Sequence, residues 1–127
     1  MRENINLAKI STFLDQYPTI FWDFDGVIKD SVAVKSIAYE RLFSSYGASV
    51  SRSVREHHEL NGGMSRFDKI PLYLRMAGVL ISDNVVEEFC AKFSNMVMER
   101  VIDSPWVPGA LEYLKKADAS TRFILVT

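Results

Sequence analysis

Two short apolar stretches, residues 19–22 and 122–126, lie near opposite ends of this chain and constrain its fold more than any other feature. Both have the length and the β-branched and aromatic content of strands. The sequence from about residue 50 to 103 follows a helical pattern throughout. Strands so far apart cannot form a hairpin, whereas a crossover connection can pair them in parallel. The sequence therefore predicts an α/β core that is interrupted by an all-helical insert.

Helical periodicity and breaker residues predict the other elements. The expected helices are residues 5–16, 32–46, 52–60, 65–76, 84–101 and 111–117. Ser65 is expected to cap its helix, and Asn84 with Glu87 three residues later has the form of a capping box. We expect Trp22, Trp106 and the phenylalanines to lie in the core. The chain then divides into a core domain, residues 1–31 with 104–127, and a helical domain, residues 32–103.

Composition excludes several classes of function. The net charge of −1, from 15 basic and 16 acidic residues, offers no field for nucleic acid or an anionic membrane. No apolar run reaches transmembrane length, and charges interrupt the N-terminal apolar stretch, which is unlike a signal peptide. The single Cys90 leaves no partner for an internal disulfide and lies in a helical apolar pattern, as a buried structural residue does. We expect a cytoplasmic protein that binds neither nucleic acid nor membrane.

The segment Asp23-Phe24-Asp25-Gly26 places two carboxylates one residue apart where the first strand ends. Residues i and i+2 of a strand share a face, so the two acids would repel each other and lose solvation. A cation, a phosphate or a shared proton would explain the pair. Gly26 permits a sharp turn that leaves both acids at the carboxyl end of the strand, where α/β sheets bind ligands. The alternative is an ordinary Asp-Gly turn.

The stretch from Thr19 to Ser31 resembles the first motif of the haloacid dehalogenase (HAD) superfamily, closest to its phosphoglycolate phosphatase and β-phosphoglucomutase branch. Val107-Pro108-Gly109-Ala110, followed by a helix and an apolar strand that ends in Thr127, resembles the approach to the second motif. This resemblance implies a partial HAD-like Rossmannoid core of parallel strands and makes residues 32–103 a mobile cap. The lysine and the acidic cluster of the third and fourth family motifs do not follow Thr127. We therefore expect the front portion of a HAD enzyme, inactive in isolation.

The resemblance also implies a reaction, which is phosphoryl transfer through an aspartyl-phosphate with Mg²⁺ as cofactor. Asp23 would attack phosphorus and bind Mg²⁺. Asp25 would protonate the leaving oxygen and then activate water or an acceptor hydroxyl, and its backbone carbonyl would be another ligand of the metal. Thr127 would bind the phosphate, unless it is a plain strand-end residue. An acid at position 25 favours a phosphatase of small phosphorylated metabolites, or a phosphomutase, over a dehalogenase. A noncatalytic interaction module is the remaining alternative.

Within the helical domain, Ser65, Arg66 and Lys69 follow a Gly-Gly pair. Ser65 can cap the helix while Arg66 and Lys69 share one face, and a helix N-terminus with two cations suits an anion. The segment resembles the cap segment that reaches over the active site in this branch, which implies substrate recognition. The alternative is a solvated basic face. His57 and His58 point about 100° apart on a helix, which does not suit a shared metal ion, and a solvated helix explains them better.

Overall fold

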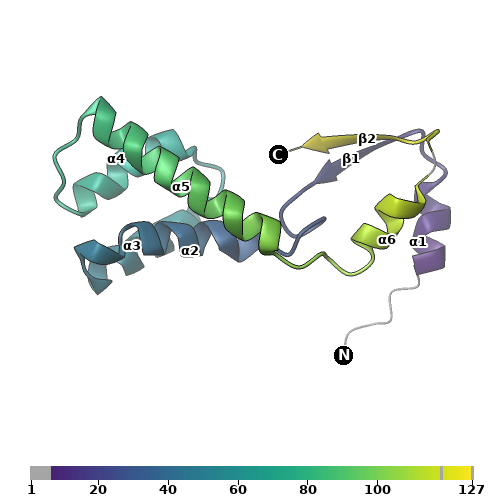
Figure 1. The fold of residues 1–127 in the computed structure, drawn as a ribbon, viewed down its shortest axis with the longest axis horizontal. Coiled ribbons are helices and arrows are strands. Elements are labelled where there is room, and N and C mark those ends of the chain that lie inside the picture. Colours follow the sequence, from purple (N-terminus) through teal and green to yellow (C-terminus); the bar gives the residue numbers. More distant parts are fainter. Residues whose placement is uncertain (1–6, 118, 127) are drawn as a thin grey trace. The chain divides into compact units, whose positions relative to one another are not determined.

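The computed structural model describes residues 7–117 and 119–126, and it is mixed α/β (Figure 1). The chain separates into two compact units, one formed by its two ends up to Ser31 and from Ser104, the other by Val32–Asp103. These bounds coincide with those drawn from the sequence, whereas the role of the helical unit as a cap stays a prediction. Within the described part of the chain, no helix has both the length and the apolar character needed to cross a membrane.

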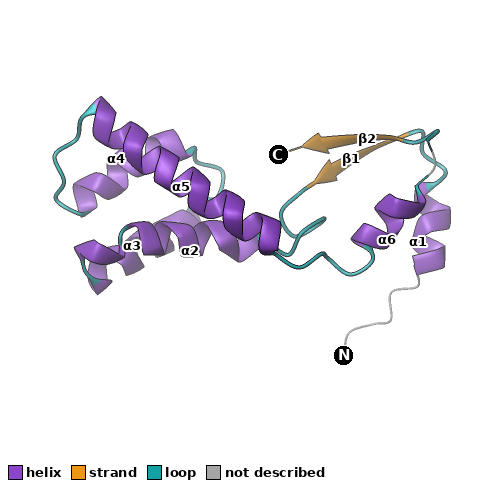
Figure 2. Ribbon diagram, viewed as in Figure 1, coloured by secondary structure: helices purple, strands orange, loops and turns teal. Residues whose placement is uncertain are grey.

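The first unit contains a two-stranded parallel sheet with helices, coloured by type in Figure 2. Its elements are α1 (Leu7–Leu14), β1 (Thr19–Asp23), α6 (Ala110–Lys116) and β2 (Arg122–Val126). Ile20 pairs with Phe123 and Asp23 pairs with Val126, so both strands end at the same edge of the sheet. The parallel pairing predicted from the distance between the two strands in the sequence is confirmed.

Only one face of this sheet is well covered by aromatic packing. The Trp22 ring lies 5.7 Å from the Tyr113 ring of α6 and 5.9 Å from the Phe123 ring of β2. Phe21 points to the opposite face, since neighbouring strand residues alternate, and it is 67% exposed. Trp106 is also exposed, at 42%. The expectation that all tryptophans and phenylalanines lie in the core is therefore wrong, because the described elements cover a single face.

The helical unit differs from the prediction at several helix ends. Its elements are α2 (Val32–Leu42), the 3-10 helix η1 (Ser44–Tyr46), α3 (Ala48–Leu60), α4 (Arg66–Met76) and α5 (Asp83–Asp103). Gly47 has a φ of +107°, which lets η1 end and α3 begin immediately, four residues earlier than expected. Ser65 caps α4 as predicted, since its side chain accepts a hydrogen bond from the Phe67 N–H. At the start of α5 the Ser82 hydroxyl, and not Asn84, accepts from the backbone, at the Val85 N–H.

Aromatic rings form the core of the helical unit. Tyr39 of α2 stacks on Phe93 of α5 with 4.0 Å between ring centroids, and Phe43 meets Tyr73 of α4 edge to face at 5.8 Å. All four side chains are at most 4% exposed. Cys90 is buried beside them, as expected. Rings from three helices thus interlock, which ties α2, α4 and α5 into one body.

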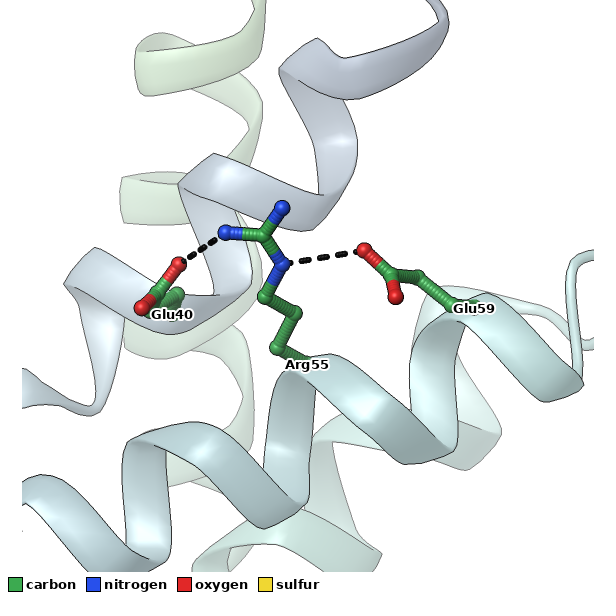
Figure 3. A network of polar contacts seen from close by, with 3 residues as sticks. All are labelled: Glu40, Arg55 and Glu59. Carbon is green, nitrogen blue, oxygen red and sulfur yellow. Dashed lines mark hydrogen bonds and ion pairs between the residues drawn. The ribbon is translucent and has the colours of Figure 1, made fainter.

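A surface network adds a connection between α2 and α3 (Figure 3). Arg55 of α3 donates to Glu40 of α2 at 2.7 Å and to Glu59 of its own helix at 2.9 Å. All three side chains are exposed, so water and salt screen the attraction. The network therefore contributes little to stability, and it occupies the Glu59 carboxylate.

The aromatic core generates a stability prediction. Phe43 is fully buried, so Phe43→Ala should lower the free energy of unfolding by about 3–5 kcal/mol, through lost burial and the cavity left behind. Phe67→Ala removes the same atoms from a side chain that is 62% exposed and should change it by about 0.5 kcal/mol or less. Urea denaturation followed by far-ultraviolet circular dichroism measures both variants. Equal losses would show that Phe43 is not a core residue.

Candidate functional site

The loop after β1 carries the two candidate catalytic acids. β1 ends at Asp23, and the Phe24 carbonyl accepts hydrogen bonds from the chain that follows it, including the Lys29 N–H at 3.2 Å. The Gly26 N–H donates to the Lys29 carbonyl at 2.7 Å, and Gly26 has a φ of +78°. The turn predicted at Gly26 is confirmed, but Asp25 lies in this loop and not on the strand. The loop, and not the alternation of a strand, therefore determines how the two carboxylates lie.

The two acids have different surroundings. Asp23 is exposed, and its Oδ1 accepts a hydrogen bond from the Phe24 N–H at 2.8 Å. Asp25 is half-buried, and its Oδ1 accepts from the Ser31 hydroxyl at 2.7 Å. Neither carboxylate is sunk in the hydrophobic core. One open and one sheltered carboxylate suit a nucleophile and an acid–base group, and their oxygens are the donors that Mg²⁺ prefers.

Ser31 is a residue to which the sequence analysis assigned no role in the site. It is 1% exposed, and its hydroxyl lies 2.7 Å from Asp25 Oδ1 and 3.3 Å from the Lys29 carbonyl. A hydroxyl has one hydrogen to donate and lone pairs to accept. It can donate to an ionised Asp25, or accept from a protonated Asp25 while donating to the carbonyl. Ser31 can therefore hold Asp25 in both protonation states.

The loop is also fixed by the segment that returns to the first unit. Lys29 Nζ donates to the Ser104 carbonyl at 2.8 Å and lies 4.5 Å from the centre of the Trp106 ring. The Asp30 N–H donates to the Pro105 carbonyl at 2.8 Å. The two segments that flank the helical unit in sequence thus bind each other. Trp106 is exposed, but its ring attracts the Lys29 ammonium through this cation–π contact.

The third residue of the predicted core site, Thr127, lies outside the described residues. Its neighbour Val126 pairs with Asp23 in the sheet register. Ligands of α/β sheets bind beyond the carboxyl ends of the strands, which is the edge where this register places the Asp23 loop. The phosphate-binding role of Thr127 stays a prediction.

The predicted substrate segment at the start of α4 carries one exposed and one buried cation. Arg66 is exposed and donates to the Ser94 hydroxyl at 2.7 Å, whereas Lys69 is only 1% exposed. The solvated basic face that was the alternative does not include Lys69, which lies beside Ile70 among the buried residues of the helix. The helix cap at Ser65 holds as predicted. Substrate recognition by these three residues stays a prediction.

The two adjacent histidines are also placed differently from the solvated helix that was expected. Both are half-buried, and His57 Nδ1 lies 3.0 Å from the Tyr73 hydroxyl. His58 Nδ1 lies 2.8 Å from Lys69 Nζ. Burial first, and then the Lys69 charge, lower the pKa of His58 from 6.5 to about 4. His58 is therefore neutral near pH 7, and the residues that contact it, Lys69 and Tyr39, come from α4 and α2.

Two other features of the described residues bear on the site. Among residues 7–117 and 119–126, no three His, Cys, Asp or Glu side chains gather to hold a metal ion. A mainly apolar pocket of about 190 Å³ lies in the first unit, lined by residues that include Trp22 and Tyr113. Trp22 Nε1 and the Tyr113 hydroxyl are covered and find no hydrogen-bond partner within this part of the chain. Because solvent cannot reach those two polar atoms, the pocket offers a ligand few polar contacts from them. The Asp23–Asp25 loop is therefore a stronger candidate for the functional site than the pocket.

Comparison with protein-family models, curated proteins and solved structures found no match to this chain. The resemblance to the HAD superfamily therefore depends on the motifs themselves, and the site must be argued from its own geometry.

Removal of the Ser31 hydroxyl should weaken the first unit. Ser31→Ala takes away the buried hydrogen bond to Asp25, which should lower the free energy of unfolding by about 1–3 kcal/mol. Tryptophan fluorescence during urea denaturation reports this unit, because Trp22 and Trp106 both belong to it. Ser44→Ala, in the helical unit, removes an exposed hydroxyl that donates to the Arg41 carbonyl and should change the free energy of unfolding, followed by far-ultraviolet circular dichroism, by about 0.5 kcal/mol or less. An unchanged Ser31→Ala variant would contradict the buried contact.

The lowered pKa of His58 predicts a pH dependence of stability. The pKa falls from 6.5 when unfolded to about 4 when folded, so the unfolded chain binds the proton first. Stability should be full above pH 6.5 and fall as the pH drops toward 4, by at most about 3 kcal/mol from this group. Urea denaturation at several pH values measures this loss. His58→Gln should reduce the dependence, whereas His57→Gln, which keeps the contact with Lys69, should retain it.

Proposed function

We propose that this chain carries the nucleophile and the acid–base group of a Mg²⁺-dependent phosphatase, which acts through an aspartyl-phosphate on a small phosphorylated metabolite. The supporting observation is the loop after β1, which joins an exposed Asp23 to a half-buried Asp25 held by Ser31. The resemblance of residues 19–31 to the first motif of the HAD superfamily points to the same chemistry. Proposed with it are the HAD-like core, the role of residues 32–103 as a cap and a cytoplasmic location.

In the proposed reaction an oxygen of Asp23 attacks phosphorus and forms the acyl phosphate, while the bond to the leaving oxygen breaks. Asp25 donates its proton to that oxygen, and then, as a carboxylate, accepts a proton from the water that attacks the Asp23 phosphate. Asp23 must be open to substrate and Asp25 must keep its orientation while its charge changes. Exposure of Asp23 and the Ser31 hydroxyl support these two requirements.

Mg²⁺ would be held by the Asp23 carboxylate and the backbone carbonyl of Asp25, as the resemblance implies, and when bound it would offset the negative charge of the phosphate. The donor set fits this ion, because both ligands are oxygens. Ser65, Arg66, Lys69 and Thr127 remain the proposed substrate and phosphate residues. Among them, Arg66 keeps an exposed guanidinium, which can bind a phosphate with two parallel hydrogen bonds.

A phosphomutase of the β-phosphoglucomutase type is the alternative reaction. It would use the same phosphorylated Asp23, and a sugar hydroxyl would replace water as the acceptor activated by Asp25. The two reactions differ in product, since only the phosphatase releases inorganic phosphate.

The proposal is tested by a screen of phosphorylated metabolites with the full-length protein and Mg²⁺. We expect phosphate release that Asp23→Asn abolishes, because an amide oxygen is a far weaker nucleophile, and that Asp25→Asn reduces by about 10²–10⁴-fold. Asp83→Asn, an exposed acid at the start of α5, is the matched control and should leave turnover unchanged.

Phosphate release that persists in Asp23→Asn would rule out the aspartyl-phosphate. Transfer between hydroxyls of a sugar without phosphate release would favour the mutase. If no metabolite turns over and Mg²⁺ leaves the amide resonances of residues 23–31 unchanged, the chain is better explained as a noncatalytic module.

A further inference from the structure

The side chain of Lys29 and the ring of Trp106 join the loop after β1 to the chain segment that precedes α6. The Lys29 ammonium donates to the Ser104 carbonyl at 2.8 Å and lies 4.5 Å from the centre of the Trp106 ring. The backbone repeats this connection, because Lys29 and Trp106 form an antiparallel bridge. Beside the bridge, the Val107 N–H donates to the Ile28 carbonyl at 3.0 Å. We call the contacts among Lys29, Ser104 and Trp106 the clasp.

The backbone of Lys29 also contacts both neighbours of Asp25. The Lys29 carbonyl accepts a hydrogen bond from the Gly26 N–H at 2.7 Å, and Gly26 follows Asp25 in the chain. The Ser31 hydroxyl lies 3.3 Å from the same carbonyl and 2.7 Å from Asp25 Oδ1. Displacement of Lys29 would therefore displace Asp25, both through the chain and through its carboxyl group.

The side-chain contacts of Lys29 are strong enough to fix that backbone. A hydrogen bond from an ammonium group is stronger than one between neutral groups, and indole is the best aromatic partner of a cation. Lys29 is half-buried, so water competes less for its ammonium than it would at an open surface. The clasp thus holds Lys29, and Lys29 holds the two groups that orient Asp25.

We propose that Lys29 and Trp106 are positioning residues, which keep Asp25 where its proton reaches the leaving oxygen of the substrate. The inference rests on the proposed function and adds two residues to it. In this step Asp25 gives its proton to the leaving oxygen while the bond from that oxygen to phosphorus breaks, and Asp25 ends as the carboxylate. Loss of the clasp should therefore slow the reaction most where the leaving oxygen needs a proton.

The test compares two substrates of the full-length protein with Mg²⁺. One is an alkyl phosphate, glycerol 3-phosphate or the best substrate of the metabolite screen, whose leaving oxygen must be protonated. The other is p-nitrophenyl phosphate, whose leaving group is stable as an anion. The measured quantity is kcat/KM, because it covers the steps up to the phosphorylation of Asp23, which include the proton transfer from Asp25.

We expect Lys29→Met and Trp106→Leu each to lower kcat/KM about tenfold for the alkyl phosphate and about twofold or less for p-nitrophenyl phosphate. Trp106→Leu keeps the Lys29 charge, so a matching loss in both variants identifies the clasp and not the charge. The double variant should lose no more than either single variant, since both changes break one interaction. Lys29→Arg keeps a cation for the ring and should stay within about twofold of the unmodified protein.

The matched control is Lys92→Met in the helical unit. It removes a cation that lies 5.5 Å from the centre of the Phe89 ring, and it should leave kcat/KM unchanged for both substrates. Amide hydrogen exchange gives a second readout that needs no substrate. The Gly26 amide, which is bonded to the Lys29 carbonyl, should exchange about tenfold faster in Lys29→Met and in Trp106→Leu, and at the original rate in Lys92→Met.

Equal losses for the two substrates, additive losses in the double variant, or unchanged exchange of the Gly26 amide would each overturn the proposal. Both single variants should fold, because Trp106 is 42% exposed and Lys29 is half-buried, and either one carries the test if the other does not fold. Absence of turnover by the unmodified protein would overturn the proposed function, and the catalytic role of the clasp with it. The exchange rate of Gly26 would then still decide whether the clasp holds the loop.

Discussion

The short loop that closes on the Phe24 carbonyl is the constraint on which the candidate active site depends. Gly26 supplies the left-handed backbone, and the Lys29 carbonyl and N–H complete the turn. This geometry ends β1 at Asp23 and directs Asp25 toward Ser31. A loop held only by its own hydrogen bonds would be flexible. The contacts of Lys29 with Ser104 and Trp106 fasten it to the segment that returns from the helical unit.

The helical unit combines an aromatic core with a buried polar contact, Lys69 to His58, that does not favour stability. Tyr39 belongs to both, since one ring stacks on Phe93 and also borders His58 and Lys69. These ring contacts pack around Lys69, a buried residue whose charge has no acidic partner among the described residues. A sequence under selection for stability alone would favour an apolar side chain at Lys69.

The first unit has a different balance. Its parallel sheet has two strands, and Phe21 on one face is largely exposed while Trp22 on the other packs against α6. Parallel sheets generally have both faces covered. The described elements thus build the ligand edge of an α/β sheet together with one of its two covering layers. The carboxylates lie at that edge, and the proposal of phosphoryl chemistry depends on this placement.

Both strands, the turn at Gly26 and the cap at Ser65 could be predicted from short stretches of sequence, and the long helical segment between the strands predicted their parallel pairing and the bounds of the helical unit. Periodicity, capping and glycine conformation act over a few residues, so a single sequence is enough to predict them. The sequence did not predict that Asp25 leaves the strand, that Ser31 binds it, or that Lys69 turns inward to His58. The first contact depends on the folded shape of an irregular loop, and the second joins two helices. Their geometry follows from how whole elements pack, and no local pattern encodes that.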